Sequence, residues 1–157
     1  MNVLAEKIVF IIAEVGVNHN GKLELAYQLV DEAKEAGADA VKFQTFNPKK
    51  LVSKVAKMAT YQKNNIGKEK SQQEMLTEIT LEKKDFVKLK EYCDEKKILF
   101  LSTPFDEESA DFLKDLVPYY KIGSGEITNL PFLKHIANMG KPIILSTGMS
   151  FLSEVET

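Results

Sequence analysis

The chain has 157 residues, of which 44% are hydrophobic and 28% charged, so it can form one domain with a buried core. Its 21 basic and 23 acidic side chains give a formal net charge of −2, and no basic cluster interleaved with aromatic residues predicts a nucleic-acid surface. No apolar run approaches the roughly 20 residues that a membrane-spanning helix needs. The single cysteine, Cys93, excludes an internal disulfide and favours a reducing, cytoplasmic compartment.

The chain begins with a strand, a loop, a helix and a second strand. A β-branched apolar run predicts a buried strand over residues 8–14, followed by a loop of glycine and asparagine over residues 16–21. Apolar residues at helical spacing predict a helix over residues 23–36, for which Gly37 is the natural C-terminal stop. Residues 40–46 then predict the second strand.

A long polar stretch follows the second strand. Residues 47–80 contain seven lysines, Asn64, Asn65 and Gly67, and a short helix is predicted around residues 75–79. The stretch is longer than an ordinary connection between a strand and a helix. It can be a binding loop or lid, or it can be a solvated insertion, and the sequence favours neither.

The rest of the chain repeats the alternation of helix and strand. A helix is predicted over 82–97, followed by a strand over 98–103 and a helix capped by Asp106. The buried stripe of that helix comprises Ala110, Phe112, Leu113, Leu116 and Val117. A strand over 119–122, a helix over 131–139, a strand over 142–146 and a helix beginning near Ser153 complete the pattern.

This pattern contains about four and a half βα units, which predicts an α/β fold whose strands are parallel and joined by right-handed crossovers. Two architectures fit the pattern, an open doubly wound sheet and a (β/α)₈ TIM barrel. A complete barrel needs about 250 residues. Residues 1–157 are therefore expected to be the N-terminal portion of a truncated barrel, or else one of two copies that pair, and the abrupt stop at Thr157 favours truncation.

Lysines inside the predicted strands give the first functional signal. Lys42 alternates with Val41 and Phe43, and Lys121 also has apolar neighbours. An ammonium taken out of water costs on the order of several kcal/mol unless a counter-charge meets it. Each lysine could instead face solvent on an amphipathic or edge strand. Parallel strands are usually covered on both faces, which favours an anion site shared by the two lysines.

Both architectures bind ligands at the carboxyl ends of their strands. The polar and loop residues predicted there are Glu14, His19, Lys42, Gln44, Ser102, Thr103, Phe105, Lys121, Ser124, Glu126 and Ser146. Lysine ammonium groups, hydroxyls and accessible backbone N–H groups together predict a phosphate or carboxylate site. The two carboxylates, Glu14 and Glu126, could orient water, bind sugar hydroxyls or act as acid and base.

These residues also have ordinary structural interpretations. The Gly-Ser-Gly segment around Ser124 is common in turns, and Glu14 can be a solvated strand end. His19 can satisfy the backbone of its loop, and no second histidine or cysteine stands at metal-ligand spacing from it. The sequence therefore predicts no metal ligands within residues 1–157.

Five segments together resemble the sialic acid synthase family. They are IIAEVGVNHNG at 11–21, VKFQTF at 41–46, STPF at 102–105, YKIGSGE at 120–126 and ILSTGM at 144–149. The similarity covers nearly the whole chain and corresponds to the N-terminal part of the family. It implies part of a (β/α)₈ barrel, in an enzyme that condenses phosphoenolpyruvate with N-acetylmannosamine or a related 2-acetamido sugar. A synthase of legionaminic or pseudaminic acid, or a non-catalytic phosphosugar-binding fragment, is the alternative.

The resemblance also implies roles for individual residues. Glu14 corresponds to the glutamate that handles the proton or water at the reacting carbon. The anchors for phosphoenolpyruvate are expected to be Lys42, Lys121, Ser124 and Ser146. The sugar contacts are expected to be Gln44, Thr103, Phe105 and Glu126, with either Asn64 or Asn65 from the long polar stretch.

The family resemblance implies further components that residues 1–157 do not supply. A divalent ion, Mn²⁺ or Mg²⁺, is expected to polarise the sugar aldehyde, with two histidine ligands beyond Thr157. The chain alone is therefore expected to be inactive. The resemblance also implies a homodimer, in which a small C-terminal antifreeze-like domain completes the sugar site.

Overall fold

The computed structural model describes residues 9–52 and 71–156, and Asn64 and Asn65 lie outside these described residues. The predicted alternation of strands and helices is confirmed. In chain order the elements are β1 Ile12–Gly16, α1 Leu23–Glu35, β2 Ala40–Thr45, α2 Pro48–Leu51, α4 Gln72–Glu78, α5 Lys83–Lys96, β3 Leu99–Pro104, α6 Glu107–Leu113, β4 Tyr120–Ile122, the 3₁₀ helix η2 Ser124–Glu126, α7 Leu130–Ala137, β5 Ile143–Leu145 and α8 Leu152–Glu156.

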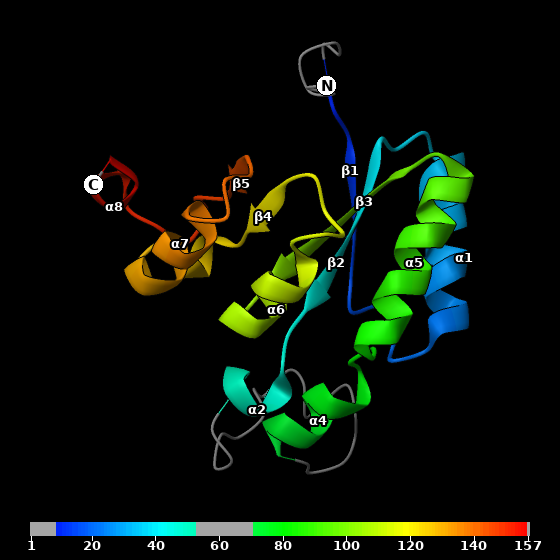
Figure 1. Ribbon diagram of the computed structural model, residues 1–157, viewed down its shortest axis with the longest axis horizontal. Helices are drawn as coiled ribbons and strands as arrows, with labels where there is room; N and C mark the ends of the chain where they lie inside the picture. Colours follow the sequence, from blue (N-terminus) through cyan, green and yellow to red (C-terminus); the bar gives the residue numbers. More distant parts are fainter. Residues whose placement is uncertain (1–8, 53–70, 157) are drawn as a thin grey trace.

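The strands are parallel and follow one another in chain order. β1, β2 and β3 form one sheet, whereas β4 and β5 pair with each other in a second, two-stranded sheet. β3 and β4 remain in contact, so the two sheets continue one another (Figure 1). A barrel keeps its strands in sequence order, whereas a doubly wound sheet reverses direction at a switch point. The order therefore selects the partial barrel over the open sheet.

The first strand begins later than the sequence predicted. It was expected over residues 8–14, but β1 starts at Ile12 because its ladder with β2 begins at the pair Ile12 and Ala40. Val9 and Ile11 are 67% and 54% exposed, so the apolar run continues beyond the paired part of the strand. Hydrophobicity alone could not show where the neighbouring strand ends.

Smaller differences concern the helices. The short helix predicted around residues 75–79 is α4, which begins earlier because Ser71 and Glu74 form a capping box at its start. α6 ends at Leu113, and Leu116 and Val117 reach the same core from the turn that follows. None of the helices within residues 9–52 and 71–156 is both long and apolar enough to cross a membrane.

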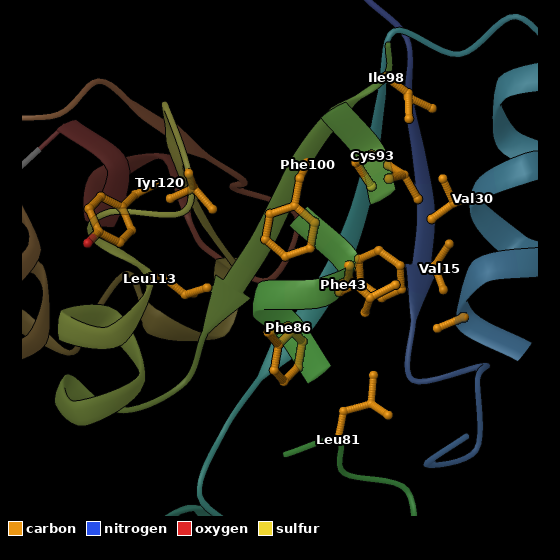
Figure 2. Close-up of a cluster of buried hydrophobic side chains, with 14 of the residues drawn as sticks. Val15, Val30, Phe43, Leu81, Phe86, Cys93, Ile98, Phe100, Leu113 and Tyr120 are labelled. Carbon is orange, nitrogen blue, oxygen red and sulfur yellow. The ribbon is translucent and has the colours of Figure 1, made fainter. Parts of the chain in front are cut away.

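The outward face of the strands forms the main core beneath the helices. Phe43 and Phe100 are fully buried there, with their ring centroids 5.8 Å apart. Figure 2 shows them among Val30 of α1 and Cys93 of α5, the two helices that lie side by side in Figure 1. Cys93 is fully buried, and burial raises the pKa of its thiol to about 12. The prediction that this cysteine packs in the core is confirmed.

The opposite face of the strands holds a smaller apolar cluster and the polar residues. The cluster comprises Ala40, Leu101 and Tyr119, with Phe10, Ile12, Leu99 and Ile144 packed against it. Side chains alternate between the two faces along a strand. Lys42 and Gln44 of β2 and Thr103 of β3 therefore follow Ala40 and Leu101 on this inner face, toward the carboxyl ends of the strands.

Asp106 joins the end of β2 to the start of α6. Its carboxylate accepts hydrogen bonds from the backbone N–H of Ser109 at 2.9 Å and from the Ser109 hydroxyl at 2.8 Å, which caps the helix. It also accepts one from the backbone N–H of Asn47 at 2.8 Å. The cap thus connects two segments that border the carboxyl ends of the strands.

We expect Asp106→Ala to lower the free energy of unfolding by about 1–3 kcal/mol, because the change removes a helix cap and leaves the N–H of Asn47 without its partner. Urea unfolding followed by circular dichroism measures the change. Glu107→Ala, which removes an exposed carboxylate from the next position, is the control and should have less than half the effect. Equal effects of the two substitutions would contradict the assigned role.

Candidate functional site

The inner face presents a buried lysine at the carboxyl ends of β1, β2 and β3. Lys42 is only 8% exposed, and its Nζ forms an ion pair with the carboxylate of Glu14. The same Nζ donates a hydrogen bond to Oγ1 of Thr103 at 3.3 Å. Strand register explains these contacts, because Glu14 lies opposite Lys42 and Thr103 lies opposite Gln44. The desolvated ammonium is therefore compensated by a carboxylate and a hydroxyl.

A second lysine occupies the same face of β4. Nζ of Lys121 donates to Oγ of Ser146 at 2.6 Å and to the carbonyl oxygen of Ile122 at 2.9 Å. Ser146 directly follows β5, and its backbone N–H donates to the Ile122 carbonyl at 3.1 Å. Each of the two lysines thus has a hydroxyl partner on the neighbouring strand, in the same direction around the barrel.

The two lysines influence each other electrostatically. Burial lowers the pKa of Lys121, the positive charge of Lys42 lowers it further, and the charge of Glu14 opposes both effects. Both lysines lie on the inner face of their strands, Lys42 in β2 and Lys121 in β4. Two cations and one carboxylate leave this rim with excess positive charge, which suits an anionic ligand.

Gln44 and Ser124, two other predicted site residues, form no hydrogen bond or ion pair with the two lysines within residues 9–52 and 71–156. The amide of Gln44 and the carboxylate of Glu14 both lie against the backbone of Gly16. Ser124 is partly buried at the start of η2, where its carbonyl oxygen accepts a long hydrogen bond, 3.4 Å, from the Ser150 hydroxyl. The structure thus places Gln44 beside the Glu14–Lys42 pair and Ser124 in the loop that leaves β4.

Glu126 and Phe105 are not joined to the two lysines. The carboxylate of Glu126 accepts a hydrogen bond from the amide of Asn129 at 2.8 Å, and within residues 9–52 and 71–156 no hydrogen bond or ion pair links it to either lysine. Phe105 packs edge-on against Phe46, with 6.3 Å between ring centroids. It also lines a separate hollow with Lys50, Asp106, Glu107, Asn129, Pro131 and Phe132.

Ser102 is one predicted residue that the structure removes from the site. It is fully buried on the outward face of β3, where its hydroxyl shares a 2.7 Å hydrogen bond with the hydroxyl of Thr45. Ser102 and Thr103 are adjacent in the sequence, so they point to opposite faces of the strand. Only Thr103 can therefore face the lysines.

His19 is buried in the loop after β1. It is 1% exposed, its Nδ1 accepts a hydrogen bond from the backbone N–H of Gly21 at 3.1 Å, and its ring centroid lies 6.0 Å from that of Phe43. Since Nδ1 is an acceptor, the neutral ring carries its proton on Nε2. His19 therefore satisfies the loop backbone, as one interpretation of the sequence predicted.

The described residues do not supply a metal centre. Across residues 9–52 and 71–156, no group of three or more histidine, cysteine, aspartate or glutamate side chains could hold a metal ion. The absence of metal ligands within residues 1–157 stays a prediction. The expected histidine ligands beyond Thr157 stay a prediction.

Comparison with known proteins decides the family. Residues 29–157 match the sequence profile of the NeuB family, over most of the chain. The chain belongs to the NeuB family. This confirms the resemblance to sialic acid synthases that the five segments predicted.

Two bacterial relatives of this NeuB-family chain carry the same name. It is 54% identical to the N,N'-diacetyllegionaminic acid synthase of Legionella pneumophila and 50% identical to that of Campylobacter jejuni. The alignments cover 93% and 96% of this chain but only 41% and 45% of those proteins. The chain thus spans less than half the length of these relatives.

A solved structure agrees with the fold. The N-acetylneuraminic acid synthetase of Leptospira borgpetersenii, crystallised with citrate, superposes with a TM-score of 0.79 at 38% sequence identity. The match covers 96% of this chain and 48% of that protein. This supports the assignment of the chain to part of a TIM barrel.

We expect the protein to lose stability as the pH falls below about 6.5, because burial lowers the pKa of His19 from its ordinary value of 6.5. The unfolded chain then binds the proton more readily than the folded one, so this contribution is complete above pH 6.5 and is lost below it. Urea unfolding at a series of pH values between about 7.5 and 5.5 measures the slope. His19→Gln should flatten it.

The chain's other histidine, His135, is the matched control. Its Nε2 pairs with the carboxylate of Asp111 at 2.8 Å on the surface. His135→Gln should keep the loss of stability below pH 6.5. If His19→Gln kept the same slope as the wild type, His19 would not be the group responsible.

Proposed function

We propose that the protein to which this chain belongs condenses phosphoenolpyruvate with a 2-acetamido sugar, forming a nonulosonic acid and releasing phosphate. The observation that carries the proposal is that Lys42 and Lys121 occupy the same inner face of the strands, with Glu14 paired to Lys42 and Ser146 to Lys121. The activities named for the bacterial relatives support the same reaction class. The alternative of a non-catalytic phosphosugar-binding fragment lacks an observation that favours it.

The arrangement of the lysines suits phosphoenolpyruvate, which carries both a phosphate and a carboxylate. Lys42 with Thr103, and Lys121 with Ser146, each pair an ammonium group with a hydroxyl. Charge-assisted hydrogen bonds from such groups are shorter and stronger than neutral ones. Because one carboxylate, Glu14, stands against two lysine charges, an anionic ligand would relieve the repulsion between them. We therefore assign Lys42, Lys121 and Ser146 to phosphoenolpyruvate, together with Ser124 in the loop after β4.

We assign the handling of protons to Glu14. Its side chain is 53% exposed although its carboxylate is held by Lys42, so a reactant or water can approach it. In the proposed reaction, C3 of phosphoenolpyruvate forms a bond to the sugar's carbonyl carbon, and the carbonyl oxygen takes the π electrons and a proton to become a hydroxyl. Water adds at C2 and Glu14 accepts one of its protons, which balances the proton that the sugar oxygen gains. The bond between C2 and the phosphate oxygen then breaks, which leaves a ketone at C2 and releases phosphate with the second proton of the water. Gln44, next to Glu14, and Thr103 are assigned to the sugar side.

Phe105 and Glu126 are the more distant sugar contacts in this proposal. Both lie in loops that follow the carboxyl ends of strands, Phe105 after β3 and Glu126 after β4. A sugar would need to extend from the lysines toward these loops to reach them. The homodimer, the divalent ion and the cytoplasmic location stay predictions, and no step of the proposed reaction is assigned to the ion.

A diacetamido sugar is the second candidate substrate. The two bacterial relatives at 54% and 50% identity are named for a product that carries two acetyl groups. Condensation with phosphoenolpyruvate adds three carbons and leaves the nitrogen substituents of the sugar unchanged. A product of this kind therefore requires a sugar that already carries two acetamido groups.

We expect the full-length protein to release phosphate from phosphoenolpyruvate only when a suitable 2-acetamido sugar and a divalent ion are present. A colorimetric phosphate assay with N-acetylmannosamine and diacetamido sugars measures this. The same sugars without an acetamido group are the controls. No release with any 2-acetamido sugar would overturn the proposed reaction.

We expect Lys121→Ala in the full-length protein to weaken phosphoenolpyruvate binding about 10- to 100-fold, or roughly 1.5–3 kcal/mol, because a charged hydrogen-bond donor is lost. Isothermal titration calorimetry measures the affinity. Lys134→Ala is the control, because it removes an exposed lysine from α7 and should leave the affinity for phosphoenolpyruvate unchanged. Equal affinities of both variants and the wild type would mean that the phosphate binds elsewhere.

A further inference from the structure

β1 contains an irregularity immediately beside the proposed active site. Glu14 pairs with Lys42, but the next paired residue of β1 is Gly16, opposite Phe43. Val15 is therefore an extra residue, and it is buried at 5% exposure. Such bulges bend a strand locally and re-aim the side chains next to them.

Gly16 has the backbone conformation that makes this bulge possible. Its φ of +57° lies in the left-handed region, which residues with a Cβ rarely adopt. Four glycines have positive φ within residues 9–52 and 71–156, so conformation alone does not set Gly16 apart. What distinguishes it is the pair of side chains against which its backbone lies.

A Cβ at Gly16 would crowd one proposed active-site side chain and touch a second. A Cβ there would lie 3.2 Å from Oε1 of Glu14 and 3.5 Å from Nε2 of Gln44. The first distance is tighter than ordinary van der Waals contact, so the Glu14 carboxylate would have to move. At 53% exposure this side chain is free to do so, at the expense of its pairing with Lys42.

We propose that Gly16 is a positioning residue of the active site. Its bare Cα allows the Glu14 carboxylate to lie close to the backbone of Gly16 while it pairs with Lys42, in the orientation that the reaction needs. This inference rests on the proposed function, because it acts through the proton-handling role of Glu14. A methyl group at this position would push the carboxylate by a few tenths of an ångström from its place beside Lys42, while leaving both lysine anchors in place.

Gly37 offers a control with the same backbone strain. Its φ is +82°, and a Cβ there would meet nothing within 4 Å. Gly37→Ala therefore carries the penalty for a left-handed alanine without touching the site. Any difference in activity between Gly16→Ala and Gly37→Ala reports the contacts with Glu14 and Gln44.

The experiment compares Gly16→Ala and Gly37→Ala in the full-length protein, each alone and combined with Glu14→Ala. We expect a similar fall in Tm for both glycine variants. Only Gly16→Ala should lower kcat, by tenfold or more, with little change in the KM for phosphoenolpyruvate. In the Glu14→Ala background, Gly16→Ala should cause no further loss, because the group through which it acts is already absent.

A crystal structure of Gly16→Ala gives a readout that does not depend on turnover, and the Glu14 carboxylate should be displaced from Lys42. If the alanine variant does not fold, Gly16→Asn replaces it, because asparagine tolerates a left-handed backbone and still carries a Cβ. Wild-type kcat in Gly16→Ala, an unmoved carboxylate, or an additive loss with Glu14→Ala would each overturn the inference. An inactive wild type would overturn the proposed function instead.

Discussion

The ion pair between Lys42 and Glu14 is the interaction on which the rest of the site depends. A lysine at 8% exposure would be strongly destabilising without a counter-charge. β1 supplies that charge because its parallel register with β2 places Glu14 opposite Lys42. Within residues 9–52 and 71–156 Lys121 forms no ion pair with a carboxylate, and the positive charge of Lys42 helps to lower the pKa of Lys121. The fold thus creates an excess of positive charge that an anion can neutralise.

The outward face of the strands carries the main apolar core, and the inner face carries the polar residues of the candidate site. Outward side chains such as Phe43 and Phe100 pack under α1 and α5, where Figure 2 shows the largest apolar cluster. Inward side chains form a small apolar layer and, toward the carboxyl ends, the polar residues. A polar side chain on the inner face therefore need not disrupt the main core. This division allows a buried lysine and its partners to be kept at the rim of the barrel.

The sequence predicted which side chains of β2 share a face better than it predicted their contacts. Alternation along β2 predicted that Lys42 and Gln44 share a face, and the structure confirms it. Ser102 was assigned to the site only because it lies at the end of a strand. That grouping failed because it ignores which face each residue occupies, and a shift of one position along the strand reverses the face. Glu126 was also grouped with the lysines, yet its carboxylate binds Asn129 in the loop before α7. A loop residue has no strand periodicity from which its direction could be predicted.

The amino-acid sequence by itself determined the alternation of strands and helices, the buried helix faces and the face of β2 that carries Lys42. These features follow from local periodicity and capping, which neighbouring residues encode. Only the tertiary structure decided that Glu14 meets Lys42, that Lys121 meets Ser146, and that the side chains of Glu14 and Gln44 both lie close to Gly16. Those contacts join residues that are distant in the sequence, and their geometry depends on strand register and backbone conformation, which no local pattern specifies.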